Sequence, residues 1–164
     1  MSCDLCKTPK TIRTCEECGK EICKQCVRYS EREAFRFLPN PSPVLQNQIF
    51  CYDCFTDKVE PEIEKYQRTL AAAKEVIYLT KNYKGIIPTL RKAKFPVQVH
   101  KHVDRRDAIM HMAFLAAHED YNAIIQADTV QKQLRNEAYQ TSEWSGSGLP
   151  VVIDIKKFER LSED

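Results

Sequence analysis

Residues 15–26 read Cys-Glu-Glu-Cys-Gly-Lys-Glu-Ile-Cys-Lys-Gln-Cys, and this stretch decides the fold of the N-terminal third of the chain. Two further Cys-x-x-Cys pairs flank it, so all eight cysteines fall in four pairs: Cys3/Cys6, Cys15/Cys18, Cys23/Cys26 and Cys51/Cys54. Two thiolates three residues apart fit on one tight turn with both sulfurs directed at one point. Zinc takes four such sulfurs in a tetrahedron at about 2.3 Å. The sequence therefore predicts two structural zinc ions within residues 1–58.

A disulfide framework and a redox motif are the alternative uses of these cysteines. The chain opens Met1-Ser2-Cys3 without a basic and apolar leader, and it has no run of about 20 apolar residues. We therefore expect a cytoplasmic protein, in which thiols stay reduced and available to metal. A thioredoxin-like motif occurs once after a strand, whereas here the motif occurs four times.

The four pairs can share two metals sequentially or in a cross-brace, and the local chemistry favours the cross-brace. Gly19 follows Cys18, where a zinc knuckle requires a residue at positive φ, and Cys3/Cys6 is the second knuckle candidate. The other two pairs precede helix-compatible sequence, as ligands in a first helical turn do. The expected first site is Cys3, Cys6, Cys23, Cys26, and the expected second site is Cys15, Cys18, Cys51, Cys54.

The stretch 15–26, followed by Gln-Ile-Phe-Cys-Tyr-Asp-Cys-Phe at 48–55, resembles a FYVE-type zinc finger. The Cys-Gly step, the four-residue gap before Cys23 and the aromatic residue after Cys54 carry this resemblance, which covers about a third of the chain. RING and PHD fingers share the cross-brace but place a histidine among the ligands, and all four histidines here lie far downstream. The resemblance implies a cross-braced, treble-clef double finger.

The residues with which FYVE domains read phosphatidylinositol 3-phosphate are missing. Trp144 is the single tryptophan, residues 11–14 before Cys15 hold one cation and no histidine, and Ile49-Phe50 replaces the basic step. Residues 1–60 contain nine Lys/Arg and nine Asp/Glu. Two tetrathiolate zinc sites would give this neutral segment a net charge of about −4. We therefore do not expect this lipid to be a partner.

Beyond the cysteines the chain is organised as a helix and a second domain. Residues 35–43 read as an irregular loop inside the finger, because three prolines within five residues exclude a helix. Its aromatic residues are expected to pack on the finger's core. Residues 59–74 form a predicted connecting helix with Pro61 in its first turn. Residues 75–156 form the predicted second domain, and 157–164 a tail.

Alternation and helical periodicity predict the elements of the second domain. Strands are expected at 76–79, at 97–103 with Val97, Val99 and Val103 on one face, at 122–134, at 139–144 and at 149–153, with a turn at 145–148. Asp104 is placed to cap a helix at 108–117. The predicted fold class is α+β, with an antiparallel sheet and one packed helix. Residues 104–125 and 144–148 resemble small bacterial domains of the YbjQ type, a family of suggested heavy-metal binders that often form rings.

Two groups of side chains in the second domain are candidate binding sites. Four histidines lie close together in the sequence: His100, His102, His111 and His118. His100 and His102 are expected to share the polar face of the strand, and His111 and His118 the polar face of the helix, so both pairs are expected to be solvated. Metal binding by these histidines is the alternative. The cations of 81–106 outnumber the single acid Asp104, and they form a candidate anion-binding segment: Lys81, Lys84, Arg91, Lys92, Lys94, Lys101, Arg105 and Arg106.

Catalytic motifs are absent from the sequence: it has no phosphate-binding glycine loop and no nucleophile elbow. A RING-like ubiquitin ligase role is the main enzymatic alternative. The favoured prediction is that this is a non-enzymatic zinc-binding protein. Its finger is expected to serve as a protein-interaction module, with another protein as partner. The alternative is an adaptor for phospholipid or nucleic acid through residues 81–106, and a homo-oligomer through the second domain is a further expectation.

Overall fold

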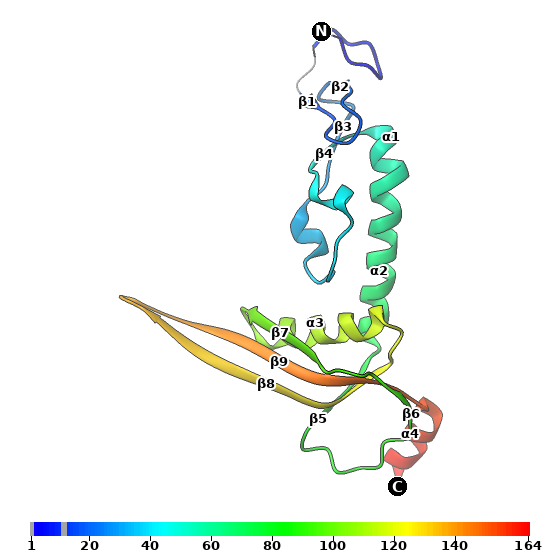
Figure 1. The fold of residues 1–164 in the computed structure, drawn as a ribbon, viewed down its shortest axis with the longest axis vertical. Coiled ribbons are helices and arrows are strands. Elements are labelled where there is room, and N and C mark those ends of the chain that lie inside the picture. The colour runs from blue at the N-terminus through cyan, green and yellow to red at the C-terminus, as the bar shows by residue number, and fades with distance from the viewer. Residues whose placement is uncertain (1, 11–12) are drawn as a thin grey trace. The chain divides into compact units, whose positions relative to one another are not determined.

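A computed structural model describes residues 2–10 and 13–164, and the chain divides into two compact units (Figure 1). Unit 1 comprises residues 1–68 and unit 2 comprises residues 69–164. Thr11 and Ile12, from the segment before Cys15, lie outside the described residues.

Two short antiparallel hairpins form the frame of unit 1. Strand β1 (Arg13–Thr14) pairs with β2 (Glu21–Ile22), and β3 (Val27–Tyr29) pairs with β4 (Ile49–Cys51). Between them the side chains of Ile22 and Phe50 are fully buried. With Val27, Phe35, Phe37, Leu45, Val59 and Tyr66 they form a small apolar core, and we expect metal binding by the cysteine clusters to add to the stability of a domain of this size.

The segment between β3 and β4 is irregular, as predicted, apart from two 3₁₀ turns, η1 (Arg32–Phe35) and η2 (Pro43–Gln46). Phe35 and Phe37 are buried, which confirms that the loop's aromatic residues pack inward. The Phe35 ring meets the ring of Tyr66 edge to face, with 5.4 Å between centroids.

The chain is helical without interruption from Tyr52 to Lys74, through α1 (Tyr52–Cys54), a π-helical turn η3 (Phe55–Val59) and α2 (Glu60–Lys74). The predicted start at residue 59 is therefore too late. Pro61 lies inside this helix, not in its first turn. A proline within a helix has no N–H to donate and its ring crowds the preceding turn, so the wide turn just before it is physically reasonable.

Unit 2 is built on a five-stranded sheet (Figure 1). Its long hairpin consists of β8 (Ala123–Asn136) and β9 (Tyr139–Ile153). Strand β5 (Ile77–Thr80) pairs with β8 in parallel, while β6 (Thr89–Lys92) and β7 (Val97–His102) pair antiparallel with successive stretches of β9. The sheet is therefore mixed, and the prediction of a purely antiparallel sheet is wrong. Parallel pairing arises because the crossover containing α3 (Arg105–His118) lies between β5 and β8.

One helix packs on each face of this sheet, so the prediction of a single packed helix is also wrong. Helix α3 begins at the predicted cap, where the Asp104 carboxylate accepts a hydrogen bond of 2.8 Å from the N–H of Asp107. Its apolar side packs on Ile124 and Ala127. The expected tail is helix α4 (Ile155–Glu163), and its Phe158 packs on the opposite face. The two faces alternate along β8, as the two-residue period of a strand requires.

Strand β9 runs straight through residues 145–148, where a turn was predicted from Ser-Gly-Ser-Gly. The glycines answer a packing need instead. A Cβ at Gly146 would lie 2.7 Å from Cε of Met112, and one at Gly148 would lie 2.4 Å from Cγ2 of Ile124. Glycine thus lets the side chains of α3 and of β8 approach the backbone of β9 closely.

Candidate metal centres

The two predicted knuckles have the same backbone geometry. In the first, the N–H of Lys7 donates to the carbonyl of Cys3 at 2.9 Å, and Lys7 has a φ of 63°. In the second, the N–H of Gly19 donates to the carbonyl of Cys15 at 2.9 Å, and Gly19 has a φ of 78°. The positive φ expected after Cys18 is confirmed. At Lys7 a non-glycine residue adopts the same conformation, at some cost in backbone strain.

The other two pairs differ from each other. Cys51 stands before the first helical turn, and its Sγ accepts a hydrogen bond of 3.4 Å from the N–H of Cys54, as expected for ligands at a helix start. Cys23 and Cys26 lie instead on a turn that leads into β3, so the expected helix there is wrong. Val27 and Tyr29 favour a strand, and pairing with β4 decides the matter.

The structure brings the eight sulfurs together in two groups of four: Cys3, Cys6, Cys23, Cys26, and Cys15, Cys18, Cys51, Cys54. This is the cross-brace grouping. Within each group the ligand atoms lie within 4.8 Å of one another. The Sγ–Sγ distance is 3.5 Å between Cys6 and Cys23 and 3.7 Å between Cys18 and Cys51. Sulfurs about 2.3 Å from a tetrahedral zinc are about 3.8 Å apart, so both groups fit that ion.

The ionisation of the thiols shows what a cation contributes. The backbone N–H of Cys6 lowers the pKa of Cys3 to about 6 despite some burial. Hydrogen bonding to the Cys6 side chain, together with burial, raises the pKa of Cys26 to about 12. In the second group burial and the neighbouring sulfurs raise the pKa of Cys54 well above its usual range. In each group, the cysteines that ionise first therefore disfavour ionisation of the remaining thiol, Cys26 or Cys54. A divalent cation would offset this repulsion between thiolates.

Acidic side chains between and beside the cysteines tie the knuckles to the hairpins. The Glu16 carboxylate accepts hydrogen bonds from the N–H groups of Gln48 (2.5 Å) and Ile49 (3.2 Å). The Glu16 N–H donates to the carbonyl of Ile49 at 3.0 Å. The second knuckle is therefore fastened to β4, which leads into Cys51.

The first knuckle has an equivalent fastening to β2. The Asp4 carboxylate accepts a hydrogen bond of 2.8 Å from the N–H of Glu21, and the Asp4 N–H donates to the carbonyl of Glu21 at 2.9 Å. Glu17 forms an ion pair with Lys58, which raises the pKa of that lysine. Asp4, Glu16 and Glu17 were not predicted to have a role, and their only signal in the sequence is their position inside a Cys-x-x-Cys pair.

The histidines were expected to lie on solvated faces, but His102 and His111 do not. Nε2 of His102 lies 2.9 Å from Nδ1 of His111, and both side chains are half-buried. Lys101 has a φ of 60° and lies in an irregularity of β7 between Val99 and His102, so the side chains there do not alternate strictly between the two faces. The prediction that His100 and His102 share one strand face is therefore wrong. Val103 is exposed, so the prediction that it shares a face with buried Val99 is wrong as well. Among the described residues only the cysteines form metal-competent groups of three or more ligands.

The eight cations of the candidate anion-binding segment are spread over several elements of unit 2. Lys81 pairs with Asp128 at 2.8 Å, Arg91 lies over the ring of Tyr121, and Arg105 donates to the Thr129 hydroxyl at 3.0 Å. Lys84, Lys92, Lys94, Lys101 and Arg106 are exposed. Part of the basic charge thus has intramolecular contacts, and anion binding by this segment stays a prediction.

No family model, curated protein or solved structure matches this chain. The FYVE-type and YbjQ-type resemblances therefore rest on the sequence motifs alone. Over the described part of the chain, no helix is both long and apolar enough to cross a bilayer.

Proposed function

We propose that unit 1 binds two structural zinc ions and that the metal-loaded finger, a FYVE-like treble clef, serves as a protein-interaction module. The observation that carries this proposal is the interleaving of two four-thiol groups along a single stretch of chain. Each group draws one pair from a knuckle and one from elsewhere in the chain, so metal binding and folding of the whole unit are one event.

The proposed role is non-enzymatic. Four cysteine ligands fill a tetrahedral zinc ion, which leaves no position for a water molecule or a substrate. Zinc bound there would supply cross-links between the knuckles, β4 and the turn before β3. The protein's own residues would provide the surface that a partner recognises.

The first test is elemental analysis of the full chain purified without added metal or a metal-binding tag. Two zinc ions per chain are expected, and Cys15→Ser should lose metal together with the folded state of unit 1. Ser30→Ala serves as the control substitution in the same unit and should keep both ions. One ion or none in the wild-type protein would refute the cross-brace.

The second test concerns the interaction. A protein recovered with the wild-type chain but not with Cys15→Ser should bind it again when both are purified, with an affinity that Lys84→Gln/Lys92→Gln leaves unchanged. If binding survives loss of the finger and disappears in the lysine variant, the basic segment of unit 2 is the interaction site instead.

A further inference from the structure

One edge of the sheet of unit 2 exposes large apolar side chains to solvent. Among the described residues, five large apolar side chains are more than two-thirds exposed, and four of them lie on or beside this edge: Ile86, Leu90, Phe95 and Val103. Strands β6 and β7 form the edge, and both pair with β9 on the side opposite β8 (Figure 1). A single exposed apolar residue is ordinary, but several on one edge indicate an interaction surface.

Two irregularities in the pairing with β9 place Leu90 and Phe95 on the outside of this edge. The stretch 89–91 advances two residues against one of β9, so Leu90 is the extra residue of a β-bulge. The stretch 92–97 advances five residues against three of β9, so the segment around Phe95 holds two extra residues. Both side chains are 71% exposed. From the strand rise, they lie about 12 Å apart along the edge.

Ile86 extends this surface on the loop before β6. It is 69% exposed, whereas its neighbour Ile87 packs on the core of the sheet. The carbonyl of Pro88 accepts a hydrogen bond of 2.9 Å from the N–H of Asp154, whose carboxylate caps α4 by accepting the N–H of Lys157. Ile86 is therefore exposed on a segment that is hydrogen-bonded to the start of α4.

The same segment is basic. Residues 82–103 contain five Lys/Arg and no Asp/Glu. Lys84 and Lys92 are exposed, and neither forms an ion pair or a hydrogen bond with a described residue. Nζ of Lys94 lies 5.5 Å from the centroid of the Phe95 ring, so a positive charge stands beside an apolar side chain. We call residues 84–95 the basic edge.

Protection of the sheet against aggregation does not account for the apolar residues of the basic edge. Bulges and lysines on an edge strand prevent its pairing with other chains, and Lys92 and Lys94 fit that role. Leu90 and Phe95 have the opposite effect, because each exposes apolar surface to water. Their exposure points to an apolar environment that this edge enters.

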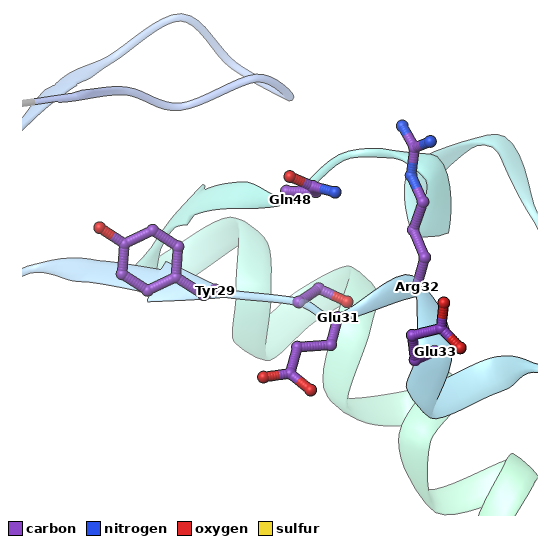
Figure 2. A pocket seen from close by; sticks show the side chains of 6 residues that line it. Tyr29, Glu31, Arg32, Glu33 and Gln48 are labelled. Carbon is purple, nitrogen blue, oxygen red and sulfur yellow. The ribbon is translucent and has the colours of Figure 1, made fainter.

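Tyr29, an exposed aromatic residue of unit 1, lies in a different electrostatic setting. It lines a groove of about 520 Å³ together with Glu31 and Glu33 (Figure 2). The expected charge of the zinc-loaded finger is also negative, about −4. An anionic surface should therefore be repelled by unit 1 and attracted by the basic edge of unit 2.

We propose that the basic edge binds the surface of a membrane that contains anionic phospholipids. Ile86, Leu90 and Phe95 would insert among the headgroups, while the lysines would stay at the level of the phosphates. Nucleic acid carries the same negative charge, but its phosphate backbone offers no apolar environment to leucine or isoleucine. A bilayer offers both. This inference goes beyond the proposed function, which concerns unit 1.

The test is sedimentation of the zinc-loaded full chain with vesicles of phosphatidylcholine, alone or with about 30% phosphatidylserine. Wild type should bind the mixed vesicles and not the neutral ones. Leu90→Ser/Phe95→Ser should bind the mixed vesicles at least tenfold more weakly, because it removes two apolar anchors. Lys84→Gln/Lys92→Gln should bind them about 10- to 30-fold more weakly, because it removes two unpaired cations.

The β8–β9 hairpin supplies matched controls. Val130→Ser/Tyr139→Ser removes two other exposed apolar side chains, and Lys132→Gln/Arg135→Gln removes two other exposed cations. Both variants should bind the mixed vesicles like wild type. An unchanged Trp144 emission spectrum in the absence of vesicles would show that unit 2 is folded in each variant.

A second measurement separates insertion from attraction by charge alone. Phe95→Trp and Tyr139→Trp each add one tryptophan to Trp144, and lipids with brominated acyl chains quench a tryptophan that enters the bilayer. Mixed vesicles containing such lipids should quench the emission of Phe95→Trp. The emission of Tyr139→Trp should be quenched no more than that of wild type.

Three results would overturn the inference: no sedimentation with the mixed vesicles, equal binding by Leu90→Ser/Phe95→Ser and wild type, or no added quenching in Phe95→Trp. If the mixed vesicles fail to bind but a DNA duplex binds wild type and not Lys84→Gln/Lys92→Gln, the basic edge is a nucleic-acid site instead. The zinc content of unit 1 is measured separately, so the proposed function does not depend on these outcomes.

Discussion

Removal of the Glu16 carboxylate should weaken metal binding although Glu16 is not a ligand. The carboxylate accepts two backbone hydrogen bonds, from Gln48 and Ile49, and so holds the second knuckle against the strand that leads to Cys51. A hydrogen bond to a charged group contributes about 1.5–3 kcal/mol when it is well shielded. Glu16 is exposed, so we discount each bond to about 0.5–1 kcal/mol for solvent screening.

The loss expected for Glu16→Ala is therefore about 1–2 kcal/mol, which corresponds to a zinc affinity about 5- to 30-fold weaker. Outer-sphere partners of metal ligands have effects of this order elsewhere. Glu16→Gln keeps an oxygen that accepts both bonds and should lose only about threefold. The assay is competition for zinc with a chromophoric chelator at fixed pH and ionic strength.

Glu64→Ala is the matched control, because Glu64 is an exposed acid of α2 whose carboxylate forms no hydrogen bond or ion pair among the described residues. It should retain the wild-type affinity. The reasoning is refuted if Glu16→Ala binds zinc within twofold of wild type, or if Glu16→Gln is impaired as strongly as Glu16→Ala.

Three further predictions concern stability. Gly148→Ala should destabilise unit 2 by about 1–3 kcal/mol, because its Cβ would lie 2.4 Å from the buried side chain of Ile124. Gly146→Ala should destabilise it less, because the flexible end of the Met112 side chain can move. Urea unfolding followed by Trp144 fluorescence measures both losses, and a larger loss for Gly146→Ala would contradict the packing account. Asn122→Ala should cost about 2 kcal/mol, since the Asn122 side chain exchanges two hydrogen bonds (2.8 and 3.1 Å) with the Ile153 backbone; an unchanged thermal midpoint would show that the bridge is not stabilising. Chelation of zinc should abolish hydrogen-exchange protection in unit 1 and spare the sheet of unit 2, whose core holds no cysteine; loss of protection in both units would contradict this.

Local patterns could be predicted where the governing chemistry is local. The positive φ after Cys18, the cap at Asp104 and the irregular proline-rich loop each depend on the residue itself and its immediate neighbours. The cross-brace grouping was also predicted correctly, from the Cys-x-x-Cys spacing and the two knuckles, although the helix expected after Cys26 is a strand.

Errors arose where distant residues override a local preference. Residues 145–148 read as a turn, but the glycines serve the close approach of Met112 and Ile124. Cys26 leads into a strand because β4 is present to pair with it. Residues 157–164 read as a tail, but the uncovered face of the sheet gives Phe158 a place to pack.

The sequence by itself determined that this chain carries two four-cysteine groups able to hold metal, because thiol spacing is a covalent property of the chain. It also determined most strands and helices of the second unit, since alternation and helical period are local. Only the tertiary structure decided that acids beside the cysteines fasten the knuckles to strands far along the chain, and that His102 faces His111. Those contacts join residues far apart in sequence, and their partners are chosen by the packing of the whole unit.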